Sequence, residues 1–97
     1  MKDYSAIKTP RSVLKNTAVK VRALRRQNKY SQVEFADRSG VSLGSLKRFE
    51  ATGLISLESF LKLIHLLDRL EEFDTILQSG DDFDAVEKLF SNKIIQK

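Results

Sequence analysis

Residues 32–50 read QVEFADRSGVSLGSLKRFE and carry the signals of two short helices in succession. Ser31, just before this stretch, and Glu34, three residues later, form the pattern of a capping box at a helix start. Gly40 predicts the end of that helix, because glycine takes the left-handed conformation at a C-terminal cap without steric cost. Ser42 is then placed to cap a second helix. The sequence therefore predicts two helices separated by only a few residues.

Apolar side chains define one inward face on each of these helices. Phe35 and Ala36 mark it on the first helix, and Leu46 and Phe49 mark it on the second. Helices of about two turns, joined only by residues 39–41, cannot lie antiparallel and must cross at a large angle. The small side chain of Ala36 lets the two backbones approach each other. This arrangement is helix-turn-helix geometry.

A longer helix is predicted upstream of these two. Thr9 offers an N-cap, and Pro10 stands at the first helical position, where proline is favoured. Apolar residues then recur at three- and four-residue spacing as far as Leu24. Because Asn16 is able to cap a second start, residues 10–27 form either one helix or two.

Helix signals continue downstream of Gly53, where the second short helix should end. Ser56 opens a helix whose apolar face continues for about six turns, with or without a bend at residues 68–69. A loop follows at residues 79–82, and a last helix is expected over residues 84–91. The long apolar face consists of Phe60, Leu63, Ile64, Leu67, Leu70, Phe73 and Leu77.

The predicted fold is an all-α small helical bundle of five to six helices. The sequence lacks the period-two alternation of strands and the Asn-Gly or Asp-Gly turns of hairpins. Its 97 residues suffice for one small domain. We expect residues 10–78 to form this domain and residues 1–9 to form a flexible basic arm. Residues 79–97 are expected to form a C-terminal helix available for a dimer or partner contact.

Charge is distributed unevenly along the chain. Residues 1–30 contain nine basic residues and one acidic residue, whereas residues 56–97 contain five basic and nine acidic residues. At a net charge of +4, this asymmetry indicates a polyanion contact near the N-terminus and a different task near the C-terminus. A merely solvated surface would carry the same charges, so charge alone does not decide between the two.

Composition argues against several classes of function. The chain has no cysteine and a single histidine, His65, so we expect no disulfide, no metal site and no cofactor. It shows no nucleophile–base pair and no glycine-rich phosphate loop, so we expect no enzyme. No apolar run is long enough to cross a bilayer and no secretory signal is evident, so we expect a cytoplasmic protein without membrane contact.

The stretch from Gln32 to Glu50 resembles the helix-turn-helix of the Cro and phage-repressor (Xre-type) family of bacterial and phage regulators. The segments VRALR at residues 21–25 and ISLESFLKLI at residues 55–64 are similar to the first and fourth helices of that family. The resemblance covers about residues 18–68 and implies a lambda-repressor-like fold. It also implies a DNA-binding transcription regulator that is associated with the bacterial nucleoid.

Within this motif the second short helix is expected to enter the DNA major groove. With its inward face buried, the outward centre of the helix falls at Gly44 and Ala51, flanked by Lys47 and Arg48. Small side chains let the helix approach a groove about 12 Å wide, and the long cations reach guanine or phosphate. Gly44 lowers helix stability by about 1 kcal/mol relative to alanine, which favours close approach to DNA over simple tolerance. Leu43, at the edge, is placed to contact a thymine methyl group.

Four polar residues are candidates for further DNA contacts. The resemblance implies a phosphate contact for Gln32, in the first turn of the first short helix. Ser42, Ser45 and Thr52 could contact DNA or serve only as caps and turn residues, and capping is favoured for Ser42. Relatives often carry Gln, Arg or Ser at the first two positions of the second short helix. The operator sequence therefore does not follow from this chain.

The resemblance further implies a structural salt bridge between Arg25 and Glu50. A helical wheel places Glu50 near the buried boundary of the second short helix, and in this family an arginine of the first helix often pairs with an acid there. Such a pair would fix the angle of the recognition helix. Two separate surface charges are the alternative.

Two functions remain open. The first is a homodimeric repressor that binds a pseudo-palindromic operator in double-stranded DNA. The second is an antitoxin that binds a partner toxin through its acidic C-terminal third and represses its own operon. The candidate dimer surfaces are Leu54–Ile55 and the last helix with Phe83, Val86 and Phe90, because one small core does not need all these apolar side chains. The alternative is that both surfaces simply close the core.

Overall fold

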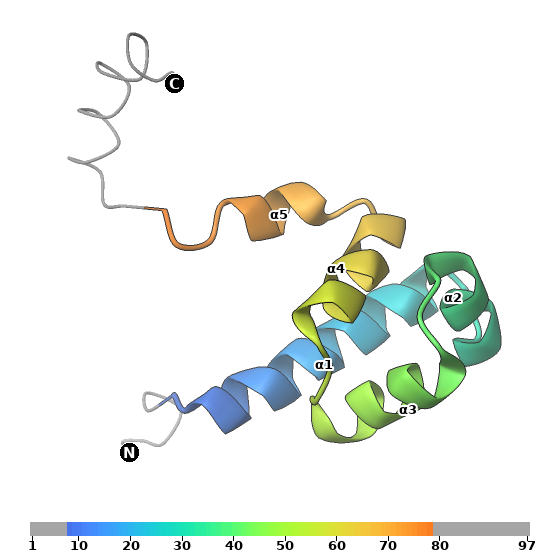
Figure 1. The fold of residues 1–97 in the computed structure, drawn as a ribbon, viewed down its shortest axis with the longest axis horizontal. Coiled ribbons are helices and arrows are strands. Elements are labelled where there is room, and N and C mark those ends of the chain that lie inside the picture. Colours follow the sequence, from blue (N-terminus) through green and yellow to red (C-terminus); the bar gives the residue numbers. More distant parts are fainter. Residues whose placement is uncertain (1–7, 79–97) are drawn as a thin grey trace, which may run out of the picture.

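The computed structural model describes residues 8–78 of the chain. These residues form five helices and no strand, so the all-α prediction is confirmed. Figure 1 shows α2 beside the C-terminal end of α1 and α3 running back along α1, with α5 leading away from the other helices. The helices are α1 (Pro10–Gln27), α2 (Gln32–Ser39), α3 (Leu43–Thr52), α4 (Leu57–Leu66) and α5 (Leu70–Asp74).

Helix α1 is continuous, so the single-helix alternative is the correct one. Its start is fixed by a reciprocal cap: the Ser12 amide donates to Thr9 Oγ1 at 3.1 Å, and the Thr9 amide donates to Ser12 Oγ at 3.0 Å. Asn16 lies exposed inside the helix and starts no second one. After the helix, Lys29 takes the left-handed conformation with φ 64° and turns the chain towards α2.

Helix α2 begins and ends at the predicted residues. Ser31 Oγ accepts a hydrogen bond from the Glu34 amide at 3.0 Å, and Gly40 ends the helix with φ 85°. The Glu34 carboxylate lies 3.2 Å from Nε of Arg38, so only the Ser31 half of the predicted capping box forms. Ser42 caps α3, as predicted. The turn between the two helices is therefore as short as the sequence required.

The core lies between the first four helices. Helix α3 packs against α1 and α2, and α4 packs against α2. Phe35, Leu46, Phe49 and Leu63 are at most 1% exposed. The ring of Phe49 also meets that of Phe60 edge-on, with 6.2 Å between centroids. Each such side chain contributes about 1.5–3 kcal/mol by leaving water, which holds α3 firmly on the bundle.

The helix predicted over residues 56–77 is not continuous: it breaks at residues 67–69, where the prediction allows a bend, and a short helix follows over residues 70–74. Helix α4 ends before Asp68, which takes the left-handed conformation with φ 62°. The amides of Asp68 and Arg69 donate to carbonyl oxygens of the last turn of α4, at 2.9 Å and 2.8 Å. These two bonds are a Schellman ending, which aspartate tolerates better than most residues. Leu77, the last residue of the predicted apolar face, is 95% exposed.

Several predictions concern residues outside the described range. They are the loop at residues 79–82, the last helix over residues 84–91 with Phe83, Val86 and Phe90, and residues 1–7 of the arm. Within the described part of the arm, Lys8 is exposed and Thr9 is the N-cap of α1. The division into arm, domain and C-terminal helix stays a prediction.

Candidate nucleic-acid interface

The outward face of α3 is slender and basic. Gly44, Lys47, Arg48 and Ala51 are all exposed, whereas the opposite face is buried in the core. At 100° per residue, Gly44 and Ala51 lie closest to the outward direction, with Lys47 on the flank nearest Glu50 and Arg48 on the other flank. The face therefore offers two very small side chains at its centre and a long cation on each flank.

Gly44 has no role that the free chain reveals. A Cβ atom built on it would meet no heavy atom within 4 Å, apart from its own chain neighbours and the backbone of its helix. Its backbone is helical, so no positive φ requires glycine there. Alanine would fit the free protein at this position and would favour the helix.

Leu43 and the three hydroxyl residues already have contacts within the chain. Leu43 is half-buried and packs against the core cluster, which leaves only its edge for a ligand. Ser42 Oγ accepts from the Ser45 amide at 3.1 Å and donates to Ser45 Oγ at 2.9 Å. Thr52 Oγ1 donates to the Arg48 carbonyl at 2.7 Å and accepts from the Leu54 amide at 3.1 Å. All three hydroxyls therefore serve the start or the end of α3.

Arg25 and Glu50 form a buried bidentate ion pair. Arg25 Nε donates to Glu50 Oε2 at 2.7 Å, and Nη2 donates to Oε1 at 3.1 Å. The two side chains are only 9% and 6% exposed. Arg25 also donates from Nη1 to the Tyr30 carbonyl at 2.8 Å. Removing one member of such a pair typically costs about 3–5 kcal/mol, because the other charge stays buried without a partner.

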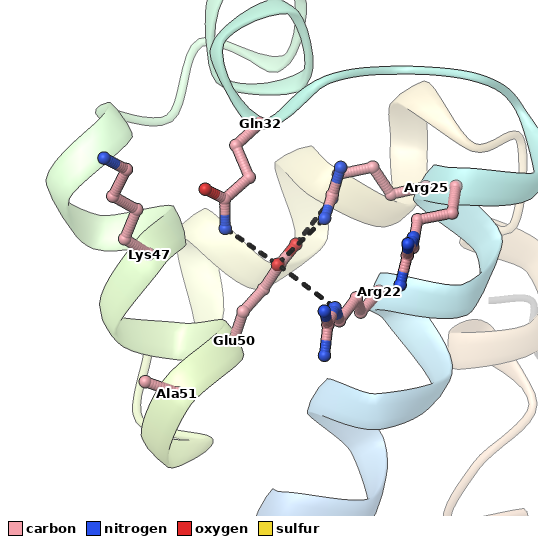
Figure 2. A pocket seen from close by; sticks show the side chains of 7 residues that line it. Arg22, Arg25, Gln32, Lys47, Glu50 and Ala51 are labelled. Atoms are coloured by element: carbon pink, nitrogen blue, oxygen red, sulfur yellow. Dashed lines mark hydrogen bonds and ion pairs between the residues drawn. The ribbon is translucent and has the colours of Figure 1, made fainter.

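Gln32 joins the same network from α2. Its Nε2 donates to Glu50 Oε1 at 2.9 Å, so the carboxylate is bonded by one residue from α1 and one from α2 (Figure 2). The Gln32 side chain is half-buried at the first position of α2. The structure thus brings Gln32, Arg25 and Glu50 together and fixes the angle at which α3 crosses α1 and α2.

A hollow of about 460 Å³ lies beside this network, between α1 and α3. Figure 2 shows Lys47 and Arg22 on opposite sides of Gln32 and Glu50. Neither Arg22 nor Arg26 was predicted at the site from the sequence. Their four-residue spacing, which puts them on one face of α1, is the signal that could have done so. The lining residues are Arg22, Arg25 and Arg26 from α1, Gln32 from α2, and Lys47, Glu50 and Ala51 from α3.

Two other features of the described residues bear on the earlier expectations. Residues 8–78 contain no group of three or more His, Asp or Glu side chains that could hold a metal ion, and His65 lies exposed near the end of α4. In the same range, no helix has both the length and the apolar character that a membrane span needs.

Comparison with known proteins agrees with this geometry. The model of a helix-turn-helix family matches residues 21–73, which is more than half of the chain. This range runs from the second half of α1 into α5 and includes every residue of the Arg25–Gln32–Glu50 network. Searches of curated proteins and of solved structures gave no match. The chain therefore belongs to the Xre-type, lambda-repressor-like helix-turn-helix family of DNA-binding transcription regulators.

Proposed function

We propose that the protein is a sequence-specific repressor that binds double-stranded DNA as a homodimer on a pseudo-palindromic operator. The observation that carries this proposal is the outward face of α3, which is slim at Gly44 and Ala51 and carries Lys47 and Arg48. A core of large apolar side chains and the buried Arg25–Glu50 pair hold that face at a fixed angle.

Direct base contact is proposed for the centre of that face. With only a hydrogen atom at Gly44 and a methyl group at Ala51, the axis of α3 can approach the floor of the major groove. Arg48 lies beside them and carries the planar group that binds guanine O6 and N7 through two hydrogen bonds. Leu43 adds an apolar edge that fits a thymine methyl group. Sequence preference should therefore depend most on Arg48.

Positioning on the DNA backbone is proposed for the first turns of α2 and α3 and for the end of α3. Gln32 stands at the first position of α2, where free amides and the positive end of the helix dipole favour a phosphate. Ser42, Ser45 and Thr52 are exposed, and each hydroxyl keeps its bond within the chain while remaining close to solvent. Contacts of this kind fix register and carry little sequence information.

The homodimer is proposed because one α3 contacts only a few base pairs, too few to specify a site in a genome. Two copies related by a two-fold axis would place their recognition helices about 34 Å apart, one turn of DNA. Of the predicted pair Leu54–Ile55, Leu54 is 44% exposed, whereas Ile55 packs against the core. Leu54 is thus the member available to a second copy.

A separate observation bears on the antitoxin alternative. Leu70, Ile76 and Leu77 are 40%, 48% and 95% exposed, close to the end of the described residues. Exposed apolar side chains in this part of the chain fit a protein surface, which a toxin would provide for an antitoxin and a second copy would provide for a homodimer. A purified protein that is monomeric alone and on DNA, yet forms a stoichiometric complex with the product of a neighbouring toxin gene, would support the antitoxin.

Selection of binding sites from random duplex DNA tests the proposal. We expect a two-fold symmetric site whose half-sites are centred about one helical turn apart. Sedimentation of the complex should show two chains on each selected site. Arg48→Ala should weaken binding by about 1–3 kcal/mol and relax the preference at one base pair in each half-site. Failure to enrich any sequence, or one chain per site at saturating protein, would contradict the proposal.

A further inference from the structure

We infer that the hollow between α1 and α3 holds one phosphodiester group of the DNA backbone, and that Lys47 acts there with Arg22 and Arg26. This inference rests on the proposed function and refines it, because it assigns Lys47 to the DNA backbone and leaves base contact to Arg48. Neither Arg22 nor Arg26 was among the residues that the sequence placed at the interface.

The hollow has more positive charge than its own carboxylate can neutralise. Both oxygens of Glu50 are already bonded, to Arg25 and Gln32. Arg22 Nε lies 4.0 Å from Glu50 Oε1, and the Arg22 side chain is 54% exposed, so this contact is long and solvated. Among the ion pairs of residues 8–78, Arg26 and Lys47 have no carboxylate partner.

The placement of these cations fits a single phosphate group. Arg22 and Arg26 stand four residues apart on one face of α1, and Lys47 lines the same hollow from α3. The buried Arg25–Glu50 pair fixes the distance between the two helices at this point. Two guanidinium groups and one ammonium group on opposite walls can all donate to the two free oxygens of one phosphodiester.

The position of the hollow relative to α3 distinguishes a backbone contact from a base contact. Lys47 and Ala51 line the hollow, whereas Gly44 and Arg48 do not. Lys47 lies on the flank of α3 that faces Glu50 and α1, and Arg48 lies on the opposite flank. A helix that enters the major groove has base edges ahead of it and sugar-phosphate backbone on its flanks. Lys47 stands on the flank nearest α1, where the backbone of one strand would pass over Arg22 and Arg26.

A salt titration with the double variant Arg22→Gln/Arg26→Gln tests this inference. The probe is a mixed-sequence duplex, and affinity is measured between about 0.05 and 0.3 M KCl by fluorescence anisotropy. Loss of one phosphate contact should make the negative slope of log K against log salt shallower by about 0.9. The wild-type advantage should therefore grow about eightfold for each tenfold dilution of salt. The matched control, Lys62→Gln/Arg69→Gln, also removes two cations, from α4 and its C-terminal turn, and should keep the wild-type slope.

Two further variants separate a phosphate contact from other roles. Arg26→Lys keeps the charge and should keep the slope. Lys47→Gln should weaken binding to all sequences by the same factor and leave the selected site unchanged, whereas Arg48→Ala changes the preference at one base pair. Because Arg22, Arg26 and Lys47 are exposed, we expect the melting temperature of each variant to stay close to that of the control.

Several outcomes would overturn the inference. If the double variant keeps the wild-type salt slope, the hollow does not bind a DNA phosphate. The proposed function would be unaffected by that result. Relaxed preference at one base pair in Lys47→Gln would make Lys47 a base-contacting residue. A wild-type protein without salt-dependent DNA binding would overturn both proposals. Inorganic phosphate that raises the melting temperature of the wild type but not of the double variant, with equal DNA slopes, would assign the hollow to a free anion.

Discussion

Gly44 lowers the stability of α3, and no contact in the free chain requires it. An added Cβ would meet nothing within 4 Å, and the residue has a helical backbone. A glycine inside a helix is destabilising by about 0.5–1 kcal/mol relative to alanine. The proposed function supplies the missing reason, because the Cβ would stand between the backbone of α3 and the base edges.

Gly44→Ala should therefore raise stability and weaken DNA binding at the same time. We expect unfolding by urea to require about 0.5–1 kcal/mol more, and affinity for the selected site to fall by about tenfold, or about 1.4 kcal/mol. Ala51→Gly is the matched control: it should lower stability by a similar amount without weakening the DNA complex. If Gly44→Ala binds the selected site as tightly as the wild type, the backbone of α3 does not approach DNA closely at this residue.

Some residues of the site could be predicted from the sequence and others could not. Arg48 and Lys47 follow from the position of α3 in the motif, and the Arg25–Glu50 contact was expected from the family resemblance. The bond from Gln32 to Glu50 did not follow, because the sequence places Gln32 at a helix start, where a phosphate or a side chain can equally accept its amide. Arg22 and Arg26 were missed because a cation on an exposed helix face looks solvated until a second helix is placed across from it.

At the scale of helices, the end of α3 is fixed against the second turn of α1 by one glycine. Gly53 has φ 86°, and a Cβ added to it would lie 2.8 Å from the Leu14 carbonyl carbon and 3.0 Å from the Lys15 amide nitrogen. These are backbone atoms of α1, so they cannot move aside without shifting the helix. Gly40 has a similar φ of 85°, but a Cβ there would meet nothing within 4 Å.

Alanine substitutions at these two glycines should therefore differ in their effect on stability. Gly40→Ala should lower the free energy of unfolding by about 1–2 kcal/mol, the usual strain of a left-handed alanine. Gly53→Ala carries the same strain and in addition must separate α3 from α1, so we expect a loss of about 3 kcal/mol or more. Urea unfolding of both variants measures the difference. Equal losses would mean that α1 and α3 can move apart at little cost in free energy.

Helix ends could be predicted where a capping residue such as serine or glycine marks them. They were missed where the backbone conformation of another residue type ends the helix. Ser31, Gly40 and Ser42 correctly predict the bounds of α2 and the start of α3. The end of α4 was taken for a bend, because the apolar spacing continues through Leu70 and Phe73. The left-handed conformation of Asp68 ends the helix there, and a chain reversal of this kind leaves the apolar periodicity almost unchanged. Phe73 still reaches the bundle by packing edge-on against Phe60, at 6.1 Å between ring centroids.

At the scale of the whole molecule, basic residues are concentrated in the first third of the chain, before and within α1. Residues 1–30 contain nine basic residues and one acidic residue, and α1 contributes three of the four cations that line the hollow. Lys2 and Lys8 precede α1 in sequence. We therefore expect residues 1–8 to extend the contact of α1 with the DNA backbone, along phosphates or into the adjacent minor groove.

Deletion of residues 1–8 tests this expectation, and the deletion must stop there because Thr9 caps α1. The negative slope of log K against log salt should become shallower by about 0.9 for each phosphate that Lys2 or Lys8 neutralises, and the melting temperature should stay unchanged. The Thr9→Ala variant is expected to behave in the opposite way: it removes the cap, which lowers stability by about 1 kcal/mol, and keeps the slope. A deletion that lowers the melting temperature and leaves the slope unchanged would show that these residues pack on the protein, since lost packing alters folding and lost phosphate contacts alter counterion release.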